Sequence, residues 1–150
     1  GRYRVIAEFA AKDEGGNGDL LMLGANAPVV GEEEEATGVR VAEVAHAVEI
    51  EVEGSLATGP DGLMTLVVRD ETGRPVELGS YLGAGAHVTG FHVDSGAVAH
   101  LHPLGPPQVT EDGTRLSFHT EFEQAGTYRS FVQVRVGGLL ETVPVTLEVG

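Results

Sequence analysis

The amino-acid sequence predicts an all-β protein whose main part is an antiparallel β-sandwich. Glycine is abundant, with 22 residues, and aromatic residues make up only 5% of the chain, which suits strands and turns better than packed helices. From residue 46 onward, short runs of alternating apolar and polar residues are separated by turn residues, the pattern of a sandwich or barrel. The predicted strands cover residues 46–53, 62–69, 85–93, 97–102, 114–122, 127–136 and 139–148.

Turn residues separate these strands. Each separator contains a glycine, proline or aspartate that adopts a turn conformation at low cost. The separators are residues 58–62, 70–75, 94–96, 111–113 and 137–138.

The first 30 residues predict a separate β-hairpin. Apolar residues alternate from Tyr3 to Phe9, and residues 20–25 form a second apolar run. The four consecutive glutamates at positions 32–35 repel one another and therefore predict a solvated linker. The predicted organisation is a hairpin at 1–30, an acidic linker at 31–45 and the sandwich at 46–150.

A short internal repeat suggests where the hairpin comes from. Residues 1–7 resemble residues 126–132, and each segment is followed by a loop and another apolar strand. The chain therefore opens on what we interpret as the last hairpin of a preceding, similar unit. Because an isolated hairpin is barely stable, we expect this one to pack on the sandwich, to pair with a second copy in a homodimer, or to complete a missing upstream domain.

Charge and composition exclude several classes of function. The net charge of -14 argues against nucleic acid and anionic membrane surfaces as partners. No apolar run reaches the 18 or so residues that a membrane span needs, so no membrane insertion is expected. The chain has no cysteine, no Gly-x-Ser-x-Gly turn and no phosphate-binding glycine loop, and its one lysine is Lys12. We therefore expect that it is not an enzyme.

The segment that ends in Tyr128 refines the fold prediction. It is similar to the tyrosine corner of immunoglobulin-like sandwiches, where a tyrosine at the start of the penultimate strand donates its hydroxyl to an upstream backbone group. Ser130 stands where antibody domains carry a cysteine, so no disulfide joins the two sheets. We predict an immunoglobulin-like antiparallel β-sandwich with an extra N-terminal β-hairpin.

The histidines are the strongest chemical feature of the sequence. Five of the six fall between residues 87 and 119, and imidazole is the commonest metal ligand in proteins. His100 and His102 are two positions apart, which on a strand places both rings on one face with Cα atoms about 7 Å apart. Two ring nitrogens at that spacing can converge on one ion at about 2.0 to 2.1 Å.

His87 is the natural third ligand, because residues 85–93 and 97–102 form a predicted hairpin. A two-residue loop that pairs Val93 with Gly96 sets His87 opposite His102, whereas a three-residue loop that pairs Val93 with Ala97 turns His87 to the other side. The sequence leaves both open.

Two other histidines have different expected roles. His119 is a candidate fourth ligand, since it points away from the apolar face of its own strand. His92, at the predicted hairpin tip, is expected to be solvated.

With nitrogen and oxygen donors, no cysteine, and only Met22 and Met64 as soft ligands, such a site favours Cu(II) or Zn(II) over Cu(I). The competing interpretation is a structural or protein-interaction module that binds no metal, in which these are ordinary histidines.

A family resemblance rests on the same residues. The segments 70–78 and 81–88, the His-Leu-His-Pro run at 100–103, and the segments 118–122 and 125–129 resemble uncharacterised exported bacterial proteins that are similar to YtkA-like and copper-resistance immunoglobulin-like domains. The resemblance covers about residues 46–149. It implies an extracytoplasmic β-sandwich that handles copper or another heavy metal, with His87, His100 and His102 at the matching positions. The copper-resistance proteins also use a mature N-terminal histidine, and Gly1 cannot take that role.

Overall fold

A computed structural model describes residues 2–12, 18–28 and 47–150 of the chain. Its contacts divide the chain into two compact units, Gly1–Glu43 and Val44–Gly150. The predicted linker at 31–45 lies outside the described residues.

The first unit contains an antiparallel hairpin of strands β1 (Arg2–Lys12) and β2 (Gly18–Pro28). The register pairs Val5 with Ala25 and Ala7 with Leu23, so these four residues share one face. Val5 and Leu23 are 58% and 61% exposed. The hairpin therefore presents apolar side chains to solvent on that face.

The second unit is built from nine antiparallel strands among the described residues. Each of the seven predicted strands is present, with bounds that differ by at most three residues, and two short strands, β5 and β8, were not predicted. The strands are β3 (Val48–Glu53), β4 (Gly59–Asp70), β5 (Leu78–Gly79), β6 (Ala86–His92), β7 (Val98–Leu101), β8 (Gln108–Thr110), β9 (Gly113–Phe122), β10 (Gly126–Val136) and β11 (Leu139–Val149).

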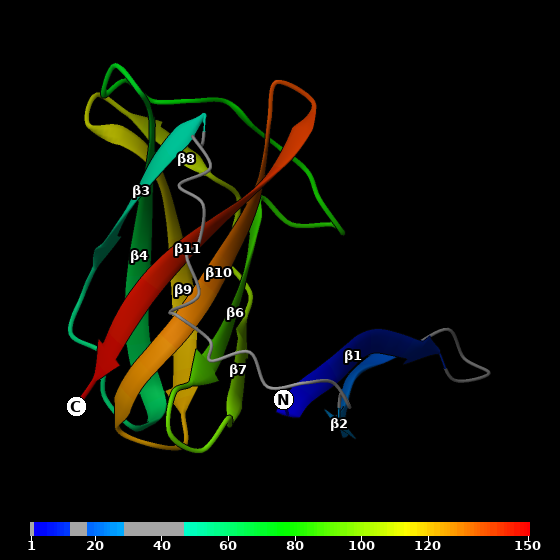
Figure 1. Ribbon diagram of the computed structural model, residues 1–150. Helices are drawn as coiled ribbons and strands as arrows, with labels where there is room; N and C mark the ends of the chain where they lie inside the picture. Colours follow the sequence, from blue (N-terminus) through cyan, green and yellow to red (C-terminus); the bar gives the residue numbers. More distant parts are fainter. Residues whose placement is uncertain (1, 13–17, 29–46) are drawn as a thin grey trace, which may run out of the picture. The chain divides into compact units, whose positions relative to one another are not determined.

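These strands form two sheets packed face to face (Figure 1). One sheet has the order β3-β4-β9-β8, and the other has the order β11-β10-β6-β7, with β5 pairing β10. The unit is thus an all-β sandwich, as predicted. The described residues include no helix of the length and apolar character needed to cross a membrane.

The core lies between the sheets and follows the strand alternation. Leu116, Phe118 and Phe122 of β9 meet Tyr128 and Val132 of β10, and all five are at most 1% exposed. Side chains two apart on a strand share a face, so each sheet presents one apolar side inward. Burial of each aliphatic or phenylalanine side chain stabilises the fold by about 1.5 to 3 kcal/mol.

Tyr128 makes the hydrogen bond that the sequence predicted. Its hydroxyl donates to the carbonyl oxygen of Gln124 at 3.0 Å, and its ring lies 4.9 Å from that of Phe122. Gly126 begins the strand at a φ of +127°, and a Cβ there would lie 2.6 Å from Nε2 of His92. Only glycine fits this backbone position.

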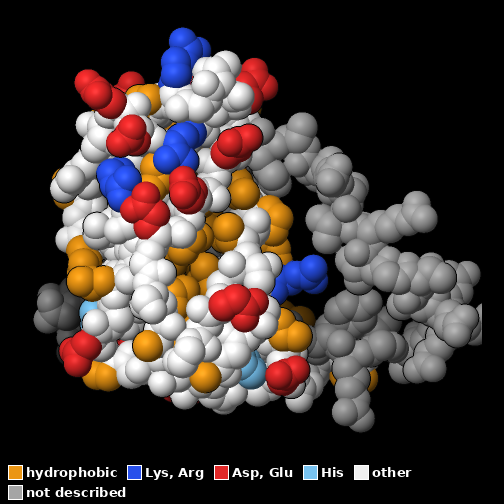
Figure 2. Space-filling view, turned by 90° about the vertical axis from the view of Figure 1, so that its left-hand side faces the viewer, with side chains coloured by type: hydrophobic (Ala, Val, Ile, Leu, Met, Phe, Trp, Pro, Cys, Tyr) orange, Lys and Arg blue, Asp and Glu red, His pale blue; other side chains and the backbone are white. Residues whose placement is uncertain are grey.

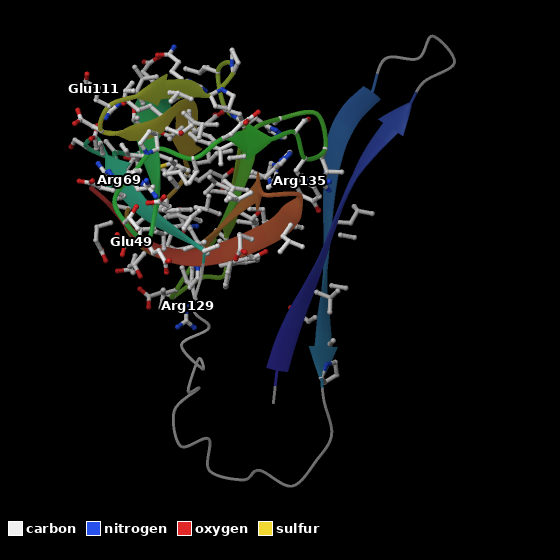
Figure 3. All side chains as sticks on the ribbon, turned by 90° about the horizontal axis from the view of Figure 1, so that it is seen from above. Glu49, Arg69, Glu111, Arg129 and Arg135 are labelled. Atoms are coloured by element: carbon white, nitrogen blue, oxygen red, sulfur yellow. The ribbon has the colours of Figure 1, made fainter. Side chains whose placement is uncertain are left out.

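Ion pairs cover part of the outer face of the β3-β4-β9 sheet. Arg69 lies opposite Glu49 in the register (Figure 3). It pairs with Glu51 at 2.7 Å, and Arg115 pairs with Glu53. Figure 2 shows basic side chains interspersed with acidic ones on one face of the molecule. Despite the high net charge, this surface is therefore not uniformly negative.

Candidate metal centre

The register of β6 and β7 brings His87 across from His102. The ladder pairs Phe91 with Val98 and Val88 with Leu101, and one further step sets His87 opposite His102. Val88 and Leu101 point into the core, so their neighbours point outward. The three histidines His87, His100 and His102 consequently share the outer face of this sheet, at its edge strand.

The turn between the two strands explains this register. The amide of His92 donates to the carbonyl of Ala97 at 2.8 Å, and the amide of Gly96 donates to the carbonyl of His92 at 2.8 Å. Gly96 has a φ of +69°, which closes the turn. Pairing follows the first of the two registers considered from the sequence, although the last pair before the turn is His92 with Ala97, with four residues between them, instead of Val93 with Gly96, with two residues between them.

The three rings converge on a common point. One ring nitrogen from each of His87, His100 and His102 lies within 4.8 Å of the others. The ring centroids are 4.5 Å apart for His100 and His102, 5.1 Å for His87 and His102, and 5.9 Å for His87 and His100. Tetrahedral coordination at about 2.0 to 2.1 Å places ligand nitrogens about 3.3 Å apart. Closing around an ion therefore requires ring movements of about 1.5 Å or less, which side-chain rotation supplies.

The turn at Tyr81 fixes one of these rings. Nε2 of His87 lies 2.9 Å from the carbonyl oxygen of Tyr81. A carbonyl only accepts hydrogen bonds, so Nε2 of His87 carries the proton and Nδ1 of the neutral ring keeps a lone pair. Tyr81 and Ala84 exchange two backbone hydrogen bonds across a tight turn in which Leu82 has a φ of +47°.

The surroundings of His100 disfavour its charged form. Burial, followed by the proximity of His102 and His87, lowers the pKa of His100 to about 4. Its Nδ1 lies 3.1 Å from Oγ1 of Thr89, its partner in the register. His100 is therefore neutral at pH 7, the form in which imidazole binds metal.

The structure does not group His119 with the other three. Its side chain is exposed, and Nε2 donates to the carbonyl oxygen of Pro60. His119 instead lines a groove of about 490 Å³ along the open edge between β7 and β9, which it shares with His100, His102, Glu121 and Glu123.

His92 differs from its predicted position. It is only 7% exposed rather than solvated, because the turn folds it back against Tyr128, with ring centroids 5.0 Å apart. The amide of Ser95 donates to Nδ1 at 3.2 Å, and Nε2 donates to the carbonyl of Ala125 at 3.1 Å. Both nitrogens are thus used to hold the turn.

Two supporting residues escaped the sequence analysis. Thr89 contacts His100 because the register sets the two residues opposite each other. The contact could have been predicted only if the register had been known from the sequence. Tyr81 acts through its backbone carbonyl oxygen. Every residue has such an oxygen, so the residue type at position 81 does not indicate this role.

Comparison with known proteins gives a family for most of the chain. Residues 42–150 match the model of a domain of unknown function, DUF8832. The chain belongs to this family. Comparisons with curated proteins and with solved structures gave no match. A chemical role for this DUF8832 domain must therefore be argued from its own residues.

Proposed function

We propose that this DUF8832 domain binds a divalent transition metal ion through His87, His100 and His102. The observation that carries the proposal is the convergence of three ring nitrogens within 4.8 Å of one another. Outer-shell contacts add support, since metal-binding histidines commonly donate their second nitrogen to a backbone carbonyl, as His87 does to Tyr81.

The donor set bears on the choice of metal. Three imidazole nitrogens without cysteine suit Zn(II), Cu(II) and Ni(II), and divalent copper binds most tightly to a given nitrogen site. We propose Cu(II) as the preferred ion and Zn(II) as the alternative. Binding and delivery of the ion, rather than catalysis, is the role that we propose.

We further propose an immunoglobulin-like fold and an extracytoplasmic location. The strand order β3-β4-β9-β8 against β11-β10-β6-β7 supports the fold, because it corresponds to the two sheets of that class. The hydrogen bond from Tyr128 to Gln124 supports it as well. The resemblance to exported bacterial copper-resistance domains supports the location.

Calorimetric titration with Cu(II) and Zn(II) tests the metal proposal. We expect the full chain to bind one equivalent with a Kd below about 100 μM. His102→Gln removes an exposed ligand with little risk to folding and should weaken binding by more than the roughly 10- to 100-fold that outer-shell changes cause. His119→Gln makes the same chemical change at an exposed histidine outside the group and serves as the matched control. Equal losses in both variants, or no binding by the wild type, would contradict the proposal.

A second proposal concerns the β1–β2 hairpin as an assembly element. We propose that it joins a second copy of the chain or completes an upstream unit of the same kind. Val5 and Leu23 are exposed on one face, whereas Ser130 of β10, which matches Val5 by the internal repeat, is buried. Exposed apolar side chains of this kind mark an interaction site, because a partner that covers them removes them from water.

Light scattering after size-exclusion chromatography tests assembly through a second copy. We expect the mass to rise from one chain to two as concentration increases, and Leu23→Lys to prevent the rise. Leu63→Lys is the matched control, because Leu63 of β4 is 62% exposed against 61% for Leu23. A single-chain mass at every concentration would contradict pairing between copies.

A further inference from the structure

We propose that Thr89 and the Tyr81 carbonyl are positioning groups that select which nitrogens of the triad bind metal: Nδ1 of His87 and Nε2 of His100. This inference rests on the proposed metal function and goes beyond it by assigning individual atoms. It also makes Thr89, whose neutral hydroxyl is a weak metal ligand, a determinant of affinity.

For His87 the assignment follows from the chemistry of its partner. The Tyr81 carbonyl has no proton to give, so the 2.9 Å contact fixes the hydrogen on Nε2. The tight turn from Tyr81 to Ala84 is closed by two backbone hydrogen bonds, at 2.8 and 3.0 Å, and this holds the carbonyl in place. The rings of Tyr81 and His87 also pack edge to face, with centroids 5.7 Å apart.

For His100 the strand pairing sets Nδ1 beside a hydroxyl oxygen that can accept its hydrogen bond. Thr89 lies directly opposite, and its Oγ1 is 3.1 Å from Nδ1. The branched threonine side chain has few rotamers, so the hydroxyl stays on the same side as His100. When Nδ1–H donates to this oxygen, the lone pair resides on Nε2, which is shielded from solvent within the cluster.

The two assignments give the site a mixed character. One imidazole presents Nδ1, close to its own backbone, and another presents Nε2, at the far end of its ring. This difference in reach lets residues on two neighbouring strands meet at one ion. Outer-shell contacts of this type typically contribute 10- to 100-fold to metal affinity.

The test combines tautomer spectroscopy with a matched pair of variants in the full chain. Thr89→Val keeps the branched shape and removes the hydroxyl, while Thr89→Ser keeps the hydroxyl. Long-range 1H–15N spectra of the metal-free wild type should show Nδ1–H for His100 and Nε2–H for His87. With Zn(II) as the probe, Thr89→Val should bind about 10- to 100-fold more weakly, and Thr89→Ser should stay within about threefold of wild type.

Each other outcome has a distinct meaning. Nε2–H at His100, Nδ1–H at His87, or equal affinities in wild type and Thr89→Val would overturn this inference while leaving the metal site intact. Weak binding that Thr89→Ser fails to restore would also overturn it, since the hydroxyl would then not be the cause. A wild type that binds no Zn(II) would overturn the proposed function itself, and this inference with it. Circular dichroism and Tm of both variants establish that the fold is retained.

Discussion

The buried hydroxyl of Tyr128 offers a quantitative test of how the sandwich is held together. Tyr128→Phe removes one oxygen and keeps the ring between Phe122 and His92, whose centroids lie 4.9 and 5.0 Å away. The residue is 1% exposed, so the carbonyl of Gln124 loses a partner that water does not readily replace. Loss of such a bond costs about 1 to 3 kcal/mol.

Urea denaturation measures this cost. With an m value of about 2 kcal/mol/M, the middle of the usual range for small proteins, the midpoint should fall by roughly 0.5 to 1.5 M without a change in m. Because Tyr128 faces the core and the triad faces outward, Zn(II) affinity should stay within about twofold of wild type. An unchanged midpoint would refute the stabilising role given to this hydrogen bond. A large loss of Zn(II) affinity would refute the view that Tyr128 and the histidine triad act independently on opposite faces of the sheet.

Three further predictions concern stability and proton competition. In the folded protein the pKa of His100 is lowered to about 4, so as pH falls the unfolded chain takes up this proton first. The stability that neutral His100 provides is therefore full above pH 6.5 and is lost towards pH 4. The pKa difference corresponds to about 3 kcal/mol, which solvent screening of a half-buried ring reduces to roughly 1 to 2 kcal/mol. Urea midpoints of wild type and His100→Gln, measured as a function of pH, check this. If the two midpoints changed with pH in parallel, the prediction would be contradicted. Gly126→Ala should lower Tm by several degrees, because its Cβ would lie 2.6 Å from Nε2 of His92 and its φ is +127°; an unchanged Tm would contradict the packing. Zn(II) affinity should fall as pH drops below about 6.5, since protons compete for the ligand nitrogens, and a pH-independent affinity would indicate carboxylate ligands instead.

Alternation and turn residues were sufficient to predict the seven longer strands. On β9, for example, Leu116, Phe118 and Phe122 mark one face, and glycines close the neighbouring turns. Strands β5 and β8 have two and three residues, too few to show a period. They exist because neighbouring strands supply hydrogen-bond partners, which is a tertiary effect.

The candidate site was predictable in part. The spacing of His100 and His102 fixed their common face, but the side on which His87 lies depends on the turn after His92, whose conformation is set by hydrogen bonds across the strand pair. His92 itself was placed in solvent because a hairpin tip is normally exposed. Its burial depends on Tyr128 and the Ala125 carbonyl, which come from a distant part of the sequence.

Anomalous diffraction at the zinc edge, from crystals of the full chain grown with one equivalent of Zn(II), tests the metal centre most directly. We expect a single strong peak on the outer face of the β6–β7 pair, bounded by His87, His100 and His102 at about 2.0 to 2.1 Å. Anomalous density confined to surface carboxylates such as Glu121 and Glu123, with none between the three rings, would contradict the account.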